Sequence, residues 1–433
     1  MTTEDLREAL ARGPLTRFQL AAIAVCIGLN MLDGFDILAM SFAASGVKAD
    51  WQLPDSQLGA LLSAGLVGMG LGAFLLGTCA DRWGRRNVVL LSITTAGCGM
   101  LASAAARDFS DLLALRVLTG FGIGGTIACV AVVVSEYAPD RWRRAALGAY
   151  ATGYSIGATV GGALATYAIP RYGWRSAFVI GGVMSLMLVP VAWRKLPESL
   201  EFLLTRRPPS ALARVNRLLD AMHRPGVTAL PDRAAGAALA LRAQLAHVLT
   251  PSTLLVWLVF FCTMAGFYFI VSWTPRLLHA AGLSARQGLT GGVLLNLGGI
   301  AGCGLYAAAA ARVDAHRLLL GALVASALLI AAFSLTLTDL DAALWTALFV
   351  GILSNAAMAG LYAVGPPLYP PEVRGTGMGW ALGVGRLGSI LAPIASGTLG
   401  DHGWQPAQLY VLCSVPFAIA AVAMLVLGPA RTR

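Results

Sequence analysis

Residues 56–106 read SQLGALLSAGLVGMGLGAFLLGTCADRWGRRNVVLLSITTAGCGMLASAAA, which is two apolar runs separated by a short charged cluster. Each run has about the 20 apolar residues that a helix needs to cross the hydrocarbon of a bilayer. Neither run alternates apolar and polar residues, as the strands of a membrane barrel do. The stretch therefore predicts two membrane-spanning helices, 56–79 and 87–106, joined by a tight polar turn.

The rest of the chain has the same character. Of its 433 residues, 57% are hydrophobic and only 12% are charged, and the mean hydropathy is +0.73. Soluble domains carry roughly 25% charged residues, so the composition excludes a soluble enzyme, a nucleic-acid binder and a disordered chain. The seven cysteines lie within apolar runs and lack metal-binding spacing, so we expect packing residues and no metal site.

Reading outward from residues 56–106 for runs of this length gives twelve spans. Their approximate limits are 18–42, 56–79, 87–106, 111–137, 145–168, 175–193, 251–274, 287–310, 317–337, 342–367, 376–399 and 407–428. The predicted fold class is an all-α polytopic membrane protein with twelve transmembrane helices.

The lysines and arginines predict the orientation, because cytoplasmic loops are enriched in them. With both termini in the cytoplasm, 23 basic residues fall inside, six fall outside, and two, Arg116 and Arg386, fall within spans. This distribution accounts for the net charge of +10 without a nucleic-acid partner. We expect a multi-pass protein of the inner (cytoplasmic) membrane. Its long helices would be surrounded by the lipid bilayer.

One long polar stretch divides the chain into residues 1–193, 194–250 and 251–433. We expect a six-helix bundle in the first and last of these parts. The middle part reads as a cytoplasmic linker, whose proline breaks leave room for two short amphipathic helices, at 210–222 and 234–248.

The two predicted bundles contain an internal repeat. Arg143-x4-Gly148-x8-Gly157 after the fourth span is matched by Arg374-x4-Gly379-x8-Gly388 after the tenth. Parallel repeats of this kind build some transporters, with the substrate site between the two halves. Scaffold residues repeat, whereas Asp33, Asp36 and Arg386 have no ionisable counterpart in the other half, which predicts that the chemistry is asymmetric.

Three cytoplasmic motifs resemble those of the major facilitator superfamily. They are Gly77-Thr-Cys-Ala-Asp81-Arg82-Trp-Gly84-Arg85-Arg86, Glu136-x6-Arg143 and Pro197-Glu198-Ser199. The resemblance implies two pseudo-symmetric six-helix halves and a secondary transporter rather than an enzyme. It also implies a cytoplasmic gate that holds the inner ends together in the outward-open state, with Asp81 facing the N-terminus of a helix such as the eleventh span. The gate residues would be Asp81, Arg82, Gly84, Arg85, Arg86, Glu136 and Arg143; the alternative is that they only anchor the cytoplasmic helix ends.

Within that superfamily, Asp33-Gly34-Phe35-Asp36 resembles the aromatic acid/proton symporters. Arg116-x3-Gly120-x-Gly122-x-Gly124-Gly125 and Gly385-Arg386-x-Gly388 support the resemblance. It implies import of a benzoate-like or hydroxybenzoate-like anion, with a proton as the coupling ion, no cofactor and no obligate protein partner. Export antiporters carry a proline where this chain has Ala158, which argues against export.

Asp33 and Asp36 are the candidates for proton coupling. They lie one helical turn apart, so we expect both to project to one side of the first span. Because a charged carboxylate in the bilayer costs about 2.5–3.5 kcal/mol, each needs a partner, a wet cavity or a proton. We expect Asp36 in particular to take the proton, and Arg116 to pair with one of the two. The alternatives are that one carboxyl only bonds a neighbouring helix and that Arg116 snorkels to the outer interface.

Arg386 lies near the middle of the eleventh span, where its planar fork suits two-point binding of a carboxylate; a purely structural ion pair is the alternative. Aromatic rings at similar depth are candidates to enclose a substrate ring, although packing is the ordinary role of such residues. Asn296 and Asn355 are candidates to bond a ring hydroxyl or a neighbouring helix. The aromatic candidates are Phe35, Phe267, Tyr268, Trp273, Tyr362 and Trp380, and Tyr268 stands out because it replaces Asp36 in the repeat.

Two other transport functions remain open: a proton symporter for non-aromatic carboxylates or dicarboxylates, and an efflux antiporter. A membrane-embedded enzyme would need a nucleophile–base or metal cluster at membrane depth. The five histidines lie in or near loops and form no such cluster.

Overall fold

The computed structural model describes residues 13–230, 251–337, 339–369 and 374–428. Within these ranges the chain is built from helices, and twelve of them, each of 20 residues or more, coincide with the twelve predicted spans. The N-terminal half comprises α2 (Arg17–Trp51), α3 (Asp55–Trp83), α4 (Arg85–Ala104), α5 (Phe109–Tyr137), α6 (Asp140–Tyr172) and α7 (Arg175–Lys195). The linker contains α8 (Leu200–Arg206) and α9 (Ala211–Ala221). The C-terminal half comprises α11 (Pro251–Ala280), α12 (Ala285–Ala309), α13 (Ala315–Thr336), α14 (Leu340–Val364), the 3₁₀ turn η1 (Pro366–Leu368), α15 (Arg374–Asp401) and α16 (Pro406–Leu427).

Eleven of the long helices in the described residues are apolar enough to cross a membrane by length and hydropathy. The twelfth is α6, whose central part reads AALGAYATGYSIGATVGGALATYA and is rich in glycine, alanine, threonine and tyrosine. This helix packs against α2 of its own half and against α12 of the other. Small residues allow such close helix packing in a membrane, which explains why α6 is long but only weakly hydrophobic.

Several helices run beyond the predicted apolar limits, because a helix continues past the hydrocarbon until its backbone is interrupted. The first span was predicted to end at residue 42, but α2 continues to Trp51 and ends at Gln52, which is left-handed (φ 51°). The tenth span, predicted at 342–367, is present as Leu340–Leu368. Within it the α-helix α14 ends at Val364, because Pro366 and Pro367 cannot donate the next helical hydrogen bonds, and the 3₁₀ turn η1 completes the span.

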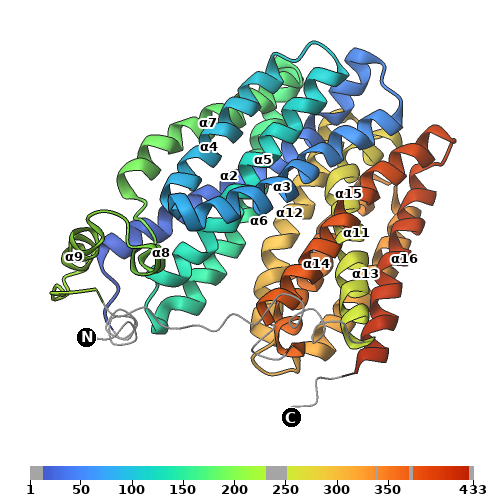
Figure 1. The fold of residues 1–433 in the computed structure, drawn as a ribbon. Helices are drawn as coiled ribbons and strands as arrows, with labels where there is room; N and C mark the ends of the chain where they lie inside the picture. Colours follow the sequence, from blue (N-terminus) through green and yellow to red (C-terminus); the bar gives the residue numbers. More distant parts are fainter. Residues whose placement is uncertain (1–12, 231–250, 338, 370–373, 429–433) are drawn as a thin grey trace.

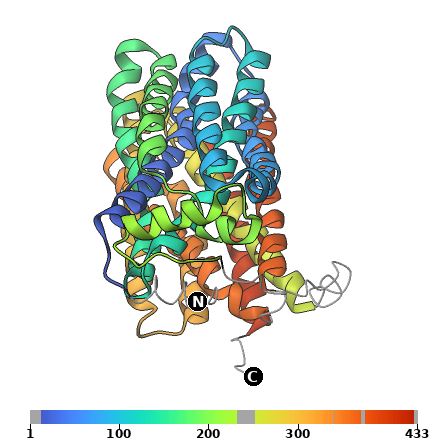
Figure 2. The same ribbon diagram turned by 60° about the vertical axis from the view of Figure 1, so that its left-hand side comes forward.

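The two halves meet at one end of the molecule and diverge toward the other (Figure 1). The start of α2 and the end of α16 both lie at the diverging end, as an even number of spans requires. The turned view shows α8 and α9 lying across the N-terminal half at the same end (Figure 2). Pairs that cross between the halves are α3 with α15, α6 with α12 and α2 with α11.

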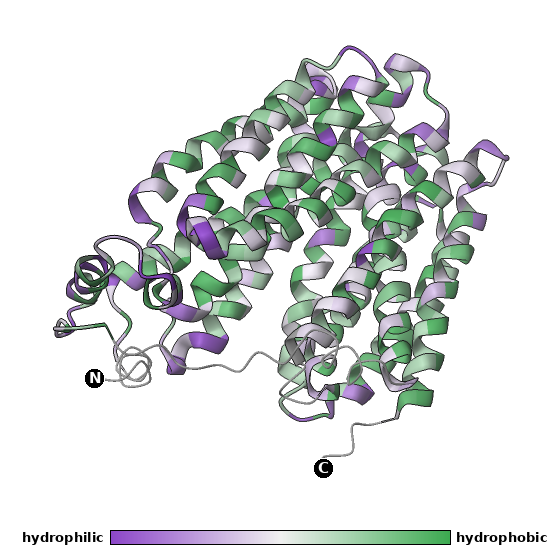
Figure 3. Ribbon diagram, in the orientation of Figure 1, coloured by the Kyte–Doolittle hydropathy of each residue, from purple (hydrophilic) through white to green (hydrophobic). Residues whose placement is uncertain are grey.

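Hydrophilic residues gather at the helix ends and on α8 and α9, and hydrophobic residues fill the long helices (Figure 3). The predicted linker helix at 210–222 is present as α9, which packs on the N-terminal half through Ala211, Val215 and Leu219. The predicted helix at 234–248 lies outside the described residues, as do the basic residues 7, 12, 233, 242, 431 and 433.

Candidate functional site

Asp33 and Asp36 are both buried in the N-terminal half, with 5% and 1% of their surface exposed. One carboxyl oxygen of each, Oδ2 of Asp33 and Oδ1 of Asp36, has no hydrogen-bond partner in the described structure. Buried polar atoms are nearly always satisfied, and a carboxylate without full hydrogen bonding is costly at this depth. Each carboxyl therefore has one buried oxygen that is open to a further hydrogen-bond partner.

The two carboxyls have different neighbours, although they lie one turn apart on α2. The Asp36 carboxylate accepts a hydrogen bond from the Ser185 hydroxyl of α7 at 3.4 Å and interacts electrostatically with Arg116 of α5. Asp33 lies within electrostatic range of Asp36 itself and of Tyr150 and Tyr154 of α6. Asp36 therefore contacts the interior of the N-terminal half, whereas Asp33 is adjacent to Gly34, whose backbone packs against Tyr154 of α6. That both carboxyls project to one side stays a prediction.

Arg116 lies deep inside the N-terminal half, where only 1% of its surface is exposed, so it does not snorkel to the outer interface. Its guanidinium donates to the backbone carbonyl of Asp36 at 3.3 Å and contacts the Met100 sulfur at 3.1 Å. It also lies 5.4 Å from the centre of the Phe178 ring. The expected ion pair is not formed, since no carboxylate of the described residues lies within 4 Å of this guanidinium. The Arg116 guanidinium thus donates a hydrogen bond to the backbone carbonyl of Asp36, and its positive charge interacts with the Asp36 carboxylate without a direct contact.

Arg386 of α15 lies half-buried between the two halves. Its guanidinium donates to the Tyr268 hydroxyl of α11 at 3.1 Å, and it lies 5.9 Å from the centre of that ring. Tyr362 of α14 and Tyr154 of α6 also interact electrostatically with Arg386. No carboxylate among the described residues pairs with this guanidinium, which leaves it able to bind an anion. We call Arg386, Tyr154, Tyr268 and Tyr362 the central cluster.

Sequence reasoning missed Tyr154. Its backbone carbonyl lies so close to Gly34 of α2 that a Cβ at residue 34 would overlap it, which fixes α6 directly beside the acidic motif. Its hydroxyl is buried and has no hydrogen-bond partner in the described residues. A weak signal was present in the sequence: the repeat offset of 231 residues between Arg143 and Arg374 pairs Arg386 with Ser155, the residue after Tyr154.

The other candidate aromatic residues have varied surroundings. Phe267 makes an edge-to-face contact with Tyr268, with ring centres 5.4 Å apart, and so supports the central cluster. Trp380 stacks on Trp257 at 5.8 Å. Phe35 packs against Gly161 of α6 within the N-terminal half, so its surroundings are those of a packing residue.

The two candidate asparagines bond their own helices. The side-chain amide of Asn296 donates to the Gly292 carbonyl at 2.8 Å, and that of Asn355 donates to the Gly351 carbonyl at 3.0 Å. Neither makes the interhelical side-chain bond that the sequence allowed. Each keeps its amide oxygen for another partner.

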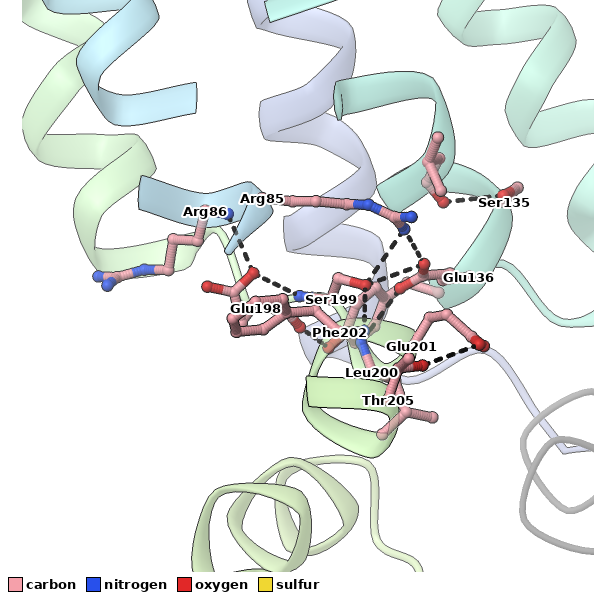
Figure 4. Close-up of polar contacts among 12 residues, drawn as sticks. Arg85, Arg86, Ser135, Glu136, Glu198, Ser199, Leu200, Glu201, Phe202 and Thr205 are labelled. Carbon is pink, nitrogen blue, oxygen red and sulfur yellow. Dashed lines mark hydrogen bonds and ion pairs between the residues drawn. The ribbon is translucent and has the colours of Figure 1, made fainter. Parts of the chain in front are cut away.

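Most of the predicted gate residues lie at the diverging end. Arg85 at the start of α4 forms an ion pair with Glu136 at the end of α5 (Figure 4). Glu136 also accepts from the Ser199 hydroxyl at 3.0 Å and from the Leu200 amide at 3.1 Å. These contacts tie the start of the linker to α4 and α5, all within the N-terminal half.

Glu198, which belongs to the Pro197-Glu198-Ser199 motif, is also part of this hydrogen-bond network. Its carboxylate accepts from the Arg86 amide at 3.1 Å. Gly84 precedes these residues with φ +90°, and a Cβ there would lie against the Glu198 carboxylate. The positive φ favours glycine at this turn, and a Cβ there would also displace the Glu198 carboxylate.

The remaining gate residues do not join the halves in this conformation. Arg143 pairs with Asp140 of its own helix at 2.7 Å. Asp81 accepts a hydrogen bond from Arg206 through its backbone carbonyl, at 2.8 Å. Arg82 lies next to Asp81 at the exposed end of α3. The predicted approach of Asp81 to the N-terminus of the eleventh span, here α15, is not among the contacts of the described residues and stays a prediction.

Hydrogen bonds join the two halves at the opposite end. Asp401 at the end of α15 accepts from the amides of Asp55 and Ser56 at the start of α3, at 2.6 and 3.0 Å. The Asp55 carboxylate binds Lys48 of its own half at 2.6 Å and Arg276 of the other half at 3.3 Å. We call these five residues the inter-half latch.

Two serines strengthen the closure next to the latch. The Ser41 hydroxyl of α2 donates to the Ser272 carbonyl of α11 at 2.7 Å, and Ser63 of α3 donates to the Ile390 carbonyl of α15 at 2.7 Å. Ser41 follows Asp33 by eight residues, which is about 12 Å along a helix. Asp33 therefore lies on the diverging side of the closed end. Tyr268 and Arg386 lie on the same side, because each precedes a bonded residue, Ser272 or Ile390, by four positions on its helix.

The comparison with known protein families agrees with this architecture. The sequence model of the Major Facilitator Superfamily matches residues 23–393. The chain belongs to the major facilitator superfamily. Membership makes the protein a multi-pass membrane transporter and not an enzyme.

Similar members of the superfamily align over nearly their whole lengths. A gallate transporter of Pseudomonas putida is 32% identical, with 99% of this chain and 96% of the relative covered. A 4-hydroxybenzoate transporter of the same species is 31% identical, with 98% and 96% covered. A 3-(3-hydroxy-phenyl)propionate transporter of Escherichia coli is 29% identical, with 95% and 94% covered.

Solved structures of the superfamily share the fold. The inward open conformation of the xylose transporter XylE from E. coli has a TM-score of 0.76 at 15% identity, covering 96% of this chain and 97% of that one. A bacterial homologue of the lysosomal transporter Spinster has a TM-score of 0.69 at 18% identity, covering 96% and 98%. At these identities the likeness concerns the arrangement of helices.

Proposed function

We propose that this chain is a proton-coupled secondary transporter that imports a small aromatic carboxylate by alternating access. The observation that carries the proposal is the unpaired Arg386 guanidinium, which lies between the halves in a group of tyrosines. A planar fork of donors suits a carboxylate, and phenol rings suit the flat face of an aromatic acid. The relatives are named as transporters of gallate, 4-hydroxybenzoate and 3-(3-hydroxy-phenyl)propionate, which are ligands of this chemistry.

The coupling ion in this proposal is a proton, and no cofactor is needed. Asp33 and Asp36 supply two buried carboxyls, each with an unsatisfied oxygen. A proton neutralises such a group and removes the cost of its charge in the membrane interior. Arg116 holds the backbone of Asp36 and offers a fixed positive charge near the ionised form.

We place the protein in the cytoplasmic (inner) membrane with the start of α2 and the end of α16 in the cytoplasm, following the distribution of lysine and arginine. In that orientation the inter-half latch is extracellular and the conformation opens inward. The substrate is the only small-molecule partner that the proposal requires, and the chain works without an obligate protein partner.

The test is an uptake panel in cells that lack endogenous aromatic-acid transport. Cells that express the chain are supplied with labelled 4-hydroxybenzoate, benzoate, gallate, 3-phenylpropionate and succinate, with empty-vector cells as control. We expect accumulation of at least one aromatic acid above the control, and its loss when a protonophore is added. Uptake of succinate alone, or accumulation that a protonophore leaves unchanged, would overturn the proposal.

A further inference from the structure

Tyr154 is the member of the central cluster that comes from the N-terminal half. Arg386, Tyr268 and Tyr362 belong to α15, α11 and α14, which are all in the C-terminal half. An anion bound to Arg386 therefore needs a group such as Tyr154 if it is to hold both halves together.

The position of Tyr154 is fixed by its backbone. Its carbonyl lies against Gly34 of α2, and one turn earlier the Tyr150 carbonyl accepts from the Asn30 side chain at 2.6 Å. Two consecutive turns of α6 are thus held on α2. The backbone from which the Tyr154 side chain extends is therefore fixed relative to α2.

The hydroxyl of Tyr154 is left without a partner at that place. It is buried and makes no hydrogen bond to any described residue. A buried hydroxyl without a partner is costly, and in a binding site such an atom indicates a ligand contact. By contrast, the Tyr268 oxygen already accepts from Arg386, which leaves its own proton free for donation.

We propose that the Tyr154 hydroxyl donates a hydrogen bond to the substrate carboxylate held by Arg386, so that one anion bridges the two halves. The proposal rests on the function proposed above and adds a substrate-contacting residue on α6. Tyr268 donates to the same carboxylate from α11. The contact on the N-terminal side comes from a residue whose backbone packs against Gly34, the neighbour of Asp33.

A substrate that contacts both halves in this way would contribute to the conformational change. With the site empty, the central cluster has no hydrogen bond between the halves in the described residues. With an anion on Arg386, the Tyr154 contact adds one. Substrate binding then favours approach of the halves around the site, which is what occlusion during alternating access requires.

The experiment compares Tyr154→Phe with Tyr167→Phe. Tyr167 lies on the same helix with 61% of its surface exposed, so its variant is a matched control for loss of a hydroxyl. Initial rates of [14C]4-hydroxybenzoate uptake give KM and Vmax, and unlabelled benzoate serves as a competitor. Thermal unfolding in detergent reports whether each variant is folded.

We expect Tyr154→Phe to raise KM about tenfold, equivalent to about 1.4 kcal/mol, with Vmax within twofold of the parent. The inhibition constant for benzoate should rise by the same factor, because both acids share the carboxylate. Tyr167→Phe should match the parent. Tyr154→His keeps a donor and should recover part of the affinity, which also covers the case of a poorly folded Phe variant.

Three results would overturn the inference: a KM for Tyr154→Phe within twofold of the parent, a loss confined to Vmax, or a loss for 4-hydroxybenzoate that spares benzoate. The last result would assign the hydroxyl to the ring substituent rather than the carboxylate. A parent protein that accumulates none of the aromatic acids in the uptake panel would instead refute the proposed function, so the two failures are distinguishable.

Discussion

Replacing Asp401 with alanine is expected to open the latched end of the molecule. Helix α3 begins after Pro54, which has no side-chain cap of its own. Its first free amides are satisfied by Asp401 of the other half, with N–O distances of 2.6 and 3.0 Å. This cap exists only while the latched ends are together, so its free energy favours the closed state of that end.

The size of the effect follows from the geometry. Removing a capping carboxylate costs about 0.5–2 kcal/mol, and the partial positive charge of the helix N-terminus contributes within that range. Asp401 is exposed, so solvent screens it. We therefore expect about 1 kcal/mol, which is roughly a fivefold shift toward opening of the latched end.

The assay is thiol labelling of Ser63→Cys. Ser63 has 1% of its surface exposed and bonds α15 across the interface, so a thiol there becomes accessible when the latched end opens. Labelling by a membrane-impermeant maleimide in intact cells should be about five times faster when Asp401→Ala is added. The chain without Ser63→Cys supplies the background from its native cysteines.

Asp339→Ala is the matched control for this experiment. The Asp339 carboxylate caps α14 within its own half, accepting from the amides of Asp341 and Ala342 at 3.0 and 3.2 Å. Its loss removes a cap without touching the interface. An unchanged labelling rate in Asp401→Ala, or an equal rise in Asp339→Ala, would show that the latch does not set the equilibrium.

Three further substitutions test other parts of the structure. Arg386→Lys keeps the charge but loses the fork and should raise KM for the transported acid at least tenfold in uptake assays; unchanged affinity would count against carboxylate binding there. Asp33→Asn combined with Asp36→Asn should abolish accumulation driven by a pH gradient while thermal unfolding stays like the parent, and continued accumulation would remove the pair from coupling. Gly84→Ala strains the turn and crowds Glu198, so it should lower the yield of folded protein by size-exclusion chromatography, whereas Gly148→Ala, where a Cβ meets nothing, should not.

The sequence was sufficient for the long helices, because run length and charge placement decide which segments cross a membrane. It placed α6 correctly although the helix is weakly apolar. It misjudged helix ends, as at Trp51 of α2, because apolar run length does not report where the backbone stops being helical.

The site was predicted less completely, because the sequence alone does not show toward which neighbouring helix each side chain points. Asp33 and Asp36 were found from their unusual depth, but their separate neighbours depend on how α2 packs on α6 and α7. The absence of an Arg116 ion pair could not be foreseen, since the same spacing also allows a bond to a carbonyl. The Asp401 cap joins residues 345 and 346 positions apart, and no local motif marks it.

The central claim is that an aromatic carboxylate and a proton cross together, and internal pH in sealed proteoliposomes tests it most directly. A trapped pH dye is followed after external 4-hydroxybenzoate is added at neutral pH, with protein-free liposomes correcting for passive entry of the neutral acid. The account predicts internal acidification above that background, absent from Asp33→Asn/Asp36→Asn. Labelled anion that enters without any extra acidification would contradict it.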